Sequence, residues 1–373
     1  MPDPPSSRSY DVIVAGASFA GLAAVSRLRG RVLLLDRQPV GEGVTSACAA
    51  PTGIVRGLGA EASIQQEHAV LVIHTPGRRA VWPLPEPFCT FDYRRFCLDA
   101  ARRAGVRLDM PDSTAGRARD DTRQGIEFRQ AAVLGRQGRT VLTSAGAFGG
   151  RLLLDATGPR AALAGARRPR HVAFGLESEI PLTVEPGLHF YFVPEIRDGY
   201  AWAFPCGRGT RFGVLSYRGR TKLRPALERF MARFGAAPGD LHGGYLATGW
   251  TSGVADDVFV IGDAAGHCLP LTGEGIRTAV LAGNRCGALV QQVLDGTLTL
   301  DAAQAAYQDF AAADRRRYRA LLVGNLLALG LPQRWVGRAA VWLAEPARLR
   351  WFFRAYFGIG KGGPAAPGSA VDT

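Results

Sequence analysis

The segment that most constrains the fold lies near the start of the chain. An apolar run over residues 10–15 is followed by the stretch GASFAG, by LAAVSRL at helical spacing and by the apolar run RVLLLD. Two short apolar runs on either side of a helix predict two parallel strands joined by a crossover helix, a unit of about 30 residues. The chain is therefore expected to contain an α/β domain built on a parallel sheet.

The turn of this unit has glycine at its first and sixth positions, Gly16 and Gly21, and Ser18 at the third. In a dinucleotide-binding turn, these positions permit a tight bend, the approach of a pyrophosphate and close packing of helix on strand. Asp36 closes the next strand, where a carboxylate can bind ribose hydroxyls. The residues that we predict to bind a dinucleotide here are Gly16, Ser18, Phe19, Ala20, Gly21, Asp36 and Arg37.

A second glycine-rich stretch, VFVIGDAAGHCLPLTGEGI over residues 258–276, indicates which dinucleotide is bound. Asp263 ends an apolar strand, where its carboxylate can accept from a ribityl or ribose hydroxyl; a helix N-cap is the alternative role. The Gly-Glu-Gly turn precedes a helix, whose N-terminus stabilises negative charge on a reduced flavin. FAD is therefore the predicted cofactor. The residues predicted to bind it here are Gly262, Asp263, Pro270, Gly273, Glu274, Gly275 and Ile276.

Residues 171–219 have a different pattern, in which short alternating runs are separated by turn signals. This pattern predicts an antiparallel sheet and a second domain. Tyr200, Trp202 and Phe204 share one face of a strand, because side chains alternate along it. They are predicted to line an apolar tunnel for substrate, and ordinary sheet core is the alternative. The full predicted set is Tyr200, Trp202, Phe204, Pro205, Phe190 and Phe192.

Taken together, these segments resemble a known superfamily. GASFAGL, the strand-end Asp36, DATG over residues 155–158 and VIGDAAG followed by LPLTGEGI resemble flavoproteins with the p-hydroxybenzoate-hydroxylase-like fold. Within that superfamily, PLTGEGI resembles the geranylgeranyl reductase family. The stretch DGYAWAFPC, followed by Gly213, resembles that family's Tyr-x-Trp-x-Phe-Pro motif. The motifs occur in the right order over about 300 residues of the chain.

The chain also departs from family patterns at three positions. Aromatic hydroxylases usually have a histidine after GDAA and an asparagine after the glycine-rich turn, where this chain has Gly266 and Ile276. These differences favour a reductase over a hydroxylase. Leu215 stands where the reductases usually have a second glycine after their aromatic motif.

The resemblance implies roles for two further segments. One is an arginine that contacts the FAD phosphates, which falls on Arg94 in FDYRRFC, with Arg95 as the alternative. The other is the loop after Asp36, which lies near the isoalloxazine ring in the family. There Ala49 is expected to contact the cofactor and Cys48 to act as a proton donor or redox modulator. The family has Cys-Gly in this loop, whereas this chain has Cys-Ala, and the alternative for Cys48 is a buried apolar side chain.

A chain of 373 residues exceeds the usual size of one domain. The predicted fold is α/β, with a Rossmann-like FAD-binding domain interleaved with a mostly antiparallel β-sheet substrate domain, and helices after both. The stretch 37–60 is glycine-rich and is predicted to be loop. The predicted boundaries are residues 1–60, 94–170 and 251–300 for the FAD-binding domain, 61–93 and 171–250 for the substrate domain, 301–357 for the C-terminal helices and 358–373 for a disordered tail.

The chain is basic, with 45 Lys and Arg against 32 Asp and Glu, which suits nucleic acid, a membrane surface or an acidic ligand; a well-solvated basic surface is the alternative. Because no basic tract exceeds the triplet at 315–317, nucleic acid is not expected. Residues 315–357 hold nine arginines and one acid, interleaved with Trp, Phe and Tyr. This composition suits a surface of anionic lipid headgroups; a helical cap over the substrate domain is the alternative. No run reaches the roughly 18 apolar residues of a spanning helix.

The six cysteines form neither a CxxC pair nor a Cys/His zinc spacing, so we expect buried thiols, a reducing compartment and no metal site. The first residues are polar and proline-rich and lack the apolar core of a signal peptide. We therefore expect a cytoplasmic protein, peripheral on the inner face of the cell membrane.

The function that the resemblance implies is FAD-dependent reduction of isolated C=C bonds in a geranylgeranyl-type lipid, by hydride transfer from reduced flavin. No second dinucleotide fingerprint occurs, so electrons are expected from transiently bound NAD(P)H or from a carrier protein. Two alternatives remain open. One is a flavin-dependent monooxygenase or halogenase that acts on a hydrophobic substrate, and the other is a non-redox flavoprotein that binds a lipid.

Overall fold

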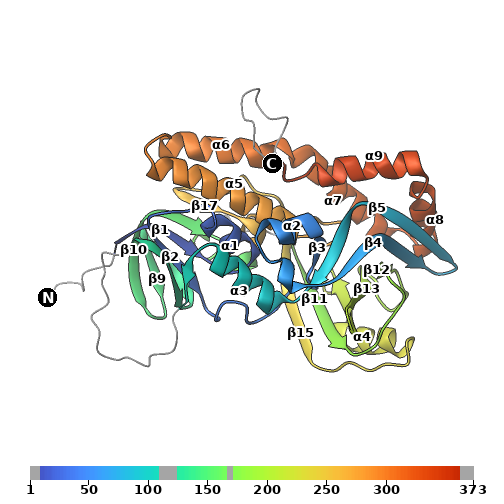
Figure 1. Ribbon diagram of the computed structural model, residues 1–373. Helices are drawn as coiled ribbons and strands as arrows, with labels where there is room; N and C mark the ends of the chain where they lie inside the picture. Colours follow the sequence, from blue (N-terminus) through green and yellow to red (C-terminus); the bar gives the residue numbers. More distant parts are fainter. Residues whose placement is uncertain (1–8, 109–123, 166–170, 362–373) are drawn as a thin grey trace.

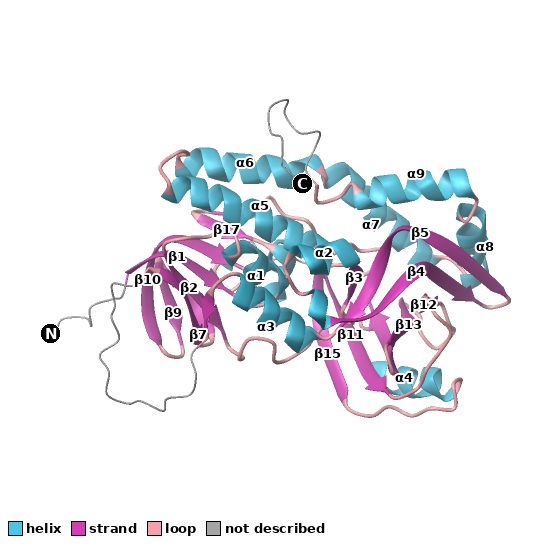
Figure 2. Cartoon of the chain, in the orientation of Figure 1, coloured by secondary structure: helices cyan, strands magenta, loops and turns pink. Residues whose placement is uncertain are grey.

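The computed structural model describes residues 9–108, 124–165 and 171–361. These residues form two β-sheets, with helices packed along both of them (Figure 1). One sheet is largely parallel and the other largely antiparallel, so the predicted α/β fold class is confirmed. Figure 2 shows the longest helices arranged as a layer over one side of the strands.

The first sheet is centred on β1 (Ser9–Ala15), which pairs in parallel with β2 (Arg31–Asp36) and β10 (Gly146–Asp155). The register places Ala15 beside Leu35 and Asp155, so the turns after all three strands meet at one edge. Ligands of parallel sheets bind at this edge, beyond the carboxyl ends of the strands. The sheet also contains β16 (Val254–Ala255), β17 (Val258–Val260), β7 (Gly125–Gln130), β6 (Val106–Arg107), and the hairpin of β8 (Val133–Gln137) and β9 (Thr140–Thr143).

Helices α1 (Phe19–Val25) and α5 (Ile276–Leu294) cross closely on one face of this sheet. A Cβ at Gly283 of α5 would lie 2.3 Å from the carbonyl oxygen of Ala20, so only glycine permits this approach. The crossing brings the start of α5 beside the turn that follows β1. Helices α3 (Tyr93–Arg103) and α6 (Leu300–Ala313) complete the layer (Figure 1).

The second sheet has the order β15-β11-β14-β13-β12-β4-β5-β3. All its pairings are antiparallel except the one between β12 and β4. Its strands are β3 (Ala49–Pro51), β4 (Ile64–Thr75), β5 (Arg78–Phe91), β11 (His171–Ile180), β12 (Leu188–Tyr191), β13 (Gly199–Cys206), β14 (Gly209–Ser216) and β15 (Leu241–Thr248).

Two of these features differ from the sequence prediction. The stretch 37–60 was predicted to be loop, but it contains β3 and the short helix α2 (Thr52–Gly57). The long β4–β5 hairpin was not predicted, because β5 carries prolines at 83, 85 and 87, and proline usually argues against a strand. The pairing of β4 with β5 shifts between His68 and Val70, beside this proline-rich stretch.

Strand β13 separates two hydrophobic clusters. Tyr200, Trp202 and Phe204 face the C-terminal helices, whereas the alternate residues Ala201 and Ala203 pack on the opposite side with α4 (Leu223–Ala232). The C-terminal helices are α7 (Arg315–Gly330), α8 (Gln333–Leu343) and α9 (Pro346–Phe357), and they cover the β4–β5 end of the second sheet (Figure 1).

The two sheets take their strands from alternating stretches of the chain, and the domain boundaries themselves stay a prediction. The prediction of a disordered tail is wrong for its first residues, because Ile359 is buried and the Gly360 N–H donates to Asp314. The rest of that tail, from residue 362, lies outside the described residues. Within the part of the chain that is described, no helix combines the length and the apolar character needed to cross a bilayer.

Candidate cofactor and substrate site

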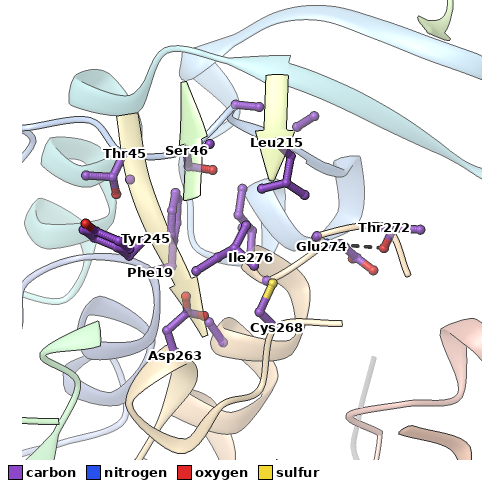
Figure 3. A pocket seen from close by; sticks show the side chains of 18 of the residues that line it. Phe19, Thr45, Ser46, Leu215, Tyr245, Asp263, Cys268, Thr272, Glu274 and Ile276 are labelled. Atoms are coloured by element: carbon purple, nitrogen blue, oxygen red, sulfur yellow. Dashed lines mark hydrogen bonds between the residues drawn. The ribbon is translucent and has the colours of Figure 1, made fainter. Parts of the chain in front are cut away.

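A cavity of about 1100 Å³ lies where the edge of the first sheet, the inner face of the second sheet and helices α7 to α9 meet. Figure 3 shows Phe19, Asp263 and Ile276 around one part of it. These three residues come from α1, from the turn after β17 and from the start of α5. The cavity therefore draws on segments that are far apart in the sequence.

The turn after β1 depends on its glycines. Gly16 has a φ of 108°, and a Cβ there would lie 2.2 Å from the carbonyl oxygen of Ala156. A Cβ at Gly21 would lie 1.8 Å from the carbonyl oxygen of Gly16. Gly16 and Ser18 line the cavity, whereas Gly21 lies behind them. The predicted turn thus presents backbone to the cavity, which is how a pyrophosphate is bound.

Asp36 is held in place with its carboxylate on the cavity wall. Its two oxygens accept from the N–H groups of Ala17, at 2.8 Å, and Gln38, at 3.0 Å. Carboxylate oxygens have further lone pairs, so the group can still accept from a ribose hydroxyl. Phe19, Ala20 and Arg37 also line the cavity, as does Ala49 from the loop after β2.

Asp263 faces the same cavity from the turn after β17 (Figure 3). Its Oδ2 accepts from the Ala247 N–H at 3.1 Å, and burial raises the pKa of the carboxyl to about 6. A buried carboxylate with so few donors is well suited to accept from a sugar hydroxyl. Gly262 does not line the cavity; its φ of 62° lets the turn pass close to Ala20.

The Gly-Glu-Gly turn forms another wall of the cavity, while Pro270 lies outside the lining. A Cβ at Gly273 would lie 2.8 Å from the Tyr200 hydroxyl, so the turn approaches the second sheet closely. Gly275 is the N-cap of α5, and no side chain caps this helix. The first N–H groups of α5 therefore remain available for a negatively charged ligand.

Arg277, which the sequence analysis did not assign, anchors this turn. Its Nε and Nη2 donate to the Glu274 carboxylate at 2.8 and 3.0 Å, and only 2% of the side chain is exposed. Its Nη1 donates to the carbonyl of Ile359 at 2.5 Å, and its guanidinium lies 5.4 Å from the centre of the Tyr356 ring. A buried arginine thus ties the start of α5 to the end of α9.

The aromatic residues of the second sheet line the other half of the cavity. Five of the six predicted substrate residues are on its wall, and Pro205 is not. The Tyr200 hydroxyl donates to the carbonyl of Thr272, whose Oγ1 lies 2.6 Å from the Tyr356 hydroxyl. The aromatic half therefore contacts the glycine-rich turn directly. Further aromatic residues that the sequence analysis did not assign to the wall are Trp82, Phe88, Phe352, Phe353, Tyr356 and Phe357.

The thiol of Cys48 does not reach the cavity, so its predicted position at the flavin is corrected. Cys48 has a φ of 49°, and its Sγ donates to the Ser46 carbonyl at 3.2 Å. Burial raises the pKa of this thiol to about 12, which makes it a poor proton donor. Its neighbours Ala47 and Ala49 line the cavity instead.

Arg94 also lies outside the cavity lining, contrary to its predicted position. Its Nη1 donates to the Glu42 carboxylate at 2.5 Å, and 67% of the side chain is exposed. Arg95, the alternative, lies on the same exposed face of α3 and pairs with Asp99. Asp155, at the end of β10, accepts from the Thr157, Leu163 and Ala164 N–H groups and so orders its own turn.

The sequence has relatives among curated proteins that are named as reductases, although no family model matches it. It is 27% identical to digeranylgeranylglycerophospholipid reductase 2 of Methanothermobacter thermautotrophicus, covering 77% of this chain and 79% of that protein. A match to the digeranylgeranylglycerophospholipid reductase of Methanococcus vannielii is 33% identical over 116 residues. It covers 26% of this chain and 29% of that protein.

Solved structures share the fold across nearly the whole chain. A geranylgeranyl bacteriochlorophyll reductase-like protein of Thermoplasma acidophilum has a TM-score of 0.74 and 17% identity, covering 93% of this chain and 99% of that one. The p-nitrophenol 4-monooxygenase of Pseudomonas putida has a TM-score of 0.71 and 13% identity, covering 96% and 100%. At such identities these structures establish the fold and not the reaction. Together, the sequence relatives and the shared fold indicate an FAD-dependent oxidoreductase that is similar in sequence to the digeranylgeranylglycerophospholipid reductases.

Proposed function

We propose that this protein reduces isolated C=C bonds in the isoprenoid chain of a lipid. The observation that carries the proposal is the composition of one cavity. Its polar half holds Asp36, Asp263 and the uncapped start of α5, and its other half is walled by aromatic side chains. An FAD-dependent enzyme with a plain alkene as substrate needs both halves, next to each other and shielded from water.

FAD fits the polar half on the chemistry of the residues present. Asp36 and Asp263, from two different strand ends, supply acceptors for sugar hydroxyls, and the turn at Gly16 presents backbone to a pyrophosphate. Once reduced by NAD(P)H or a carrier protein, FAD supplies the hydride that the alkene accepts. The N–H groups at the start of α5 stabilise negative charge near this turn.

The aromatic half holds and shields the isoprenoid chain. Tyr200, Trp202 and Phe204 present their rings along one strand face, and Phe190 packs against Phe204 with ring centres 5.2 Å apart. Such a wall contributes apolar surface and excludes water, and it holds the alkene in one orientation. The aromatic lining of this half suits an isoprenoid chain better than a small polar substrate.

The entrance to the aromatic half suits a lipid surface. Leu327 and Leu331 at the end of α7 and Trp335 on α8 line the cavity, yet their exposed fractions are 60%, 48% and 46%. Arg338 lies over the Trp335 ring, with its guanidinium carbon 4.5 Å from the ring centre. Exposed apolar side chains beside arginine suit an anionic bilayer. We therefore propose that this entrance, defined as Leu327, Leu331 and Trp335, contacts the inner face of the cell membrane.

The test is an anaerobic single turnover. Purified enzyme is reduced with dithionite and mixed with a geranylgeranyl glycerophospholipid, while flavin absorbance is followed and the product is analysed by mass spectrometry. We expect flavin reoxidation without oxygen and a product heavier by two hydrogens per reduced bond. The matched control is the same lipid with saturated chains, which should leave the flavin reduced.

Two other outcomes would contradict the proposal. A flavin that stays reduced until air enters, followed by an oxygenated or halogenated product, would indicate a monooxygenase or halogenase. A lipid that binds without any change in flavin redox state, in air or without it, would indicate a non-redox flavoprotein.

A further inference from the structure

Glu177 is a buried carboxylate on the cavity wall, and neither cofactor binding nor shielding of the lipid chain requires it. Glu177, on β11, lines the cavity, and 4% of its side chain is exposed. Its Oε2 accepts from the indole Nε1–H of Trp202 at 2.7 Å. Its Oε1 lies 2.9 Å from Nε2 of His242, which also lines the cavity. The carboxylate therefore connects the aromatic wall to a histidine.

The sheet places these residues in one row. His242 on β15 is the register partner of Glu177 on β11, and Glu177 is the partner of Gly213 on β14. Gly213 is in turn the partner of Trp202 on β13. Because Gly213 has no side chain, the indole ring lies across it and reaches the carboxylate. The row extends over four adjacent strands.

The pair of Glu177 and His242 can hold one proton that is exchangeable with water. The proton between Oε1 and Nε2 belongs to an imidazolium beside a carboxylate, or to a carboxylic acid beside an imidazole. The side chain of His242 is 27% exposed, whereas that of Glu177 is 4% exposed. Histidine thus links the buried acid to solvent, which is the arrangement that a reloading proton donor needs.

Other acidic groups on the wall are less suited to give up a proton to the substrate. Burial raises the pKa of the Tyr200 and Tyr356 hydroxyls and of the Cys268 thiol well above their ordinary values. The carboxylate of Glu274 is bound by Arg277. Asp36 and Asp263 lie in the polar half, where sugar hydroxyls are expected. Glu42, which also lines the cavity, is bound by Arg94. Glu177 is the carboxyl group that is bonded to the Trp202 side chain of the aromatic wall.

We propose that Glu177, with His242, is the proton donor of alkene reduction; this inference rests on the proposed function. The π bond of the substrate breaks as hydride from the reduced flavin forms a C–H bond at one carbon. The proton held by the pair forms a C–H bond at the other carbon. The pair, now one proton short, regains it from water at the exposed edge of His242. Trp202 positions the carboxylate through its N–H.

The experiment is an anaerobic single turnover in D₂O, comparing wild type, Glu177→Gln and the control Glu67→Gln. Glu67 lies on β4, pairs with Arg56 at the surface and is outside the cavity lining. Wild type and control should place a solvent deuterium at each alkene carbon, because flavin reduced by dithionite in D₂O also carries deuterium at N5. At the carbon that receives the proton, this deuterium should have a single configuration. Glu177→Gln should bind FAD normally, react about 100-fold slower or more, and give both configurations at that carbon.

A second readout does not depend on turnover. In the FAD-bound, oxidised protein, the imidazole ¹⁵N resonances of His242 should differ between wild type and Glu177→Gln, because the partner of Nε2 changes from a carboxylate to an amide. Because Glu177 is buried and His242 is partly exposed, His242→Ala is the safer variant for folding. Its reaction rate should fall similarly and recover in part when free imidazole is added.

Results of three kinds would overturn the inference. They are a Glu177→Gln rate within a few-fold of wild type with unchanged deuterium configuration, unchanged His242 resonances in that variant, or no rescue of His242→Ala by imidazole. If wild type itself yields no hydrogenated product while its FAD is bound and reducible, the proposed function fails, and the inference fails with it. Normal wild-type reduction with unaffected variants refutes the inference alone.

Discussion

A Cβ on Gly213 would lie 2.0 Å from the Cζ2 atom of the Trp202 indole, so the ring occupies the space where any other residue would place its side chain. The contact explains why this strand position is glycine. It also fixes the indole against the sheet, with its N–H directed at Glu177. The aromatic wall of the cavity is thus shaped by a residue that has no side chain and does not itself line the cavity.

Replacing Gly213 with alanine should therefore displace Trp202. We expect the free energy of unfolding to fall by about 1–3 kcal/mol, as for other overpacked cores, and the tryptophan fluorescence spectrum to change. Urea denaturation measures the first and steady-state fluorescence the second. The control is Gly135→Ala on β8, where a Cβ would meet no atom within 4 Å. Equal effects of the two substitutions would show that the indole is not held in this way.

Arg277→Met should destabilise the fold strongly. It leaves the Glu274 carboxylate, 7% exposed, without its partner, and removes a donor from the Ile359 carbonyl. Breaking a buried ion pair costs about 3–5 kcal/mol. We expect a loss of that size in urea denaturation, and partial recovery when Glu274→Leu is added, because the stranded charge is then removed. The control is Arg354→Met on the exposed side of α9; a similar loss there would contradict the assignment.

The stability of the cofactor-free protein should depend on Asp263 in mildly acidic solution. Burial raises the pKa of this carboxyl from 3.8 to about 6 in the folded state, so the folded protein keeps a proton that the unfolded chain has already released. The contribution of the Asp263 carboxyl to the free energy of unfolding is present below about pH 4 and is lost as the pH rises to about 6. The loss through this group is about 3 kcal/mol.

This dependence is measured as a difference between two proteins. The free energy of unfolding of wild type minus that of Asp263→Asn should decline from about pH 4 to about pH 6 and then level off, since asparagine does not titrate. Saturating FAD should shrink the decline, because a sugar hydroxyl that donates to the carboxylate favours its charged form. Parallel pH profiles for the two cofactor-free proteins would refute the role given to burial.

Binding to anionic membranes should depend on the entrance. The double variant Leu327→Asp/Trp335→Asp is expected to bind vesicles of equal parts phosphatidylglycerol and phosphatidylcholine about tenfold less tightly than wild type. Apolar area is lost and like charges face the lipid. Sedimentation with vesicles measures this. The control is Leu134→Asp on β8, which is also exposed; β8 pairs with β9, which Figure 1 shows at the other end of the molecule from α8. Equal vesicle binding by wild type and the entrance variant would contradict the proposal.

The residues that sequence reasoning placed well are those whose geometry is local. The βαβ unit, with Gly16 and Asp36, follows from glycine spacing and from strand periodicity. The shared face of Tyr200, Trp202 and Phe204 follows from side-chain alternation alone. Asp263 at the end of its strand was placed in the same way, because a strand end and its turn are set by neighbouring residues.

The residues that were misplaced or missed depend on distant partners or on one backbone angle. Cys48 lies outside the cavity lining and has a φ of 49°, a backbone angle that no spacing reveals. Arg94 was placed by family resemblance, and the helix directs it toward Glu42 instead. Glu177 and His242 are 65 residues apart and become partners only through the pairing of β11 with β15. Arg277 was missed because hydrophobic patterning gives no reason to expect a charged side chain in the interior of the protein.

The bonds of Arg277 also set an order of assembly. Its carbonyl partners on Tyr356 and Ile359 are 79 and 82 residues further along the chain. A protein is synthesised from its N-terminus, so the glycine-rich turn leaves the ribosome long before the helix that secures it. A growing chain can pair the strands of both sheets before Tyr356 and Ile359, the residues that hold this turn, have been made. The start of α5, to which we assign the stabilisation of negative charge, is therefore secured only after α9 has been made.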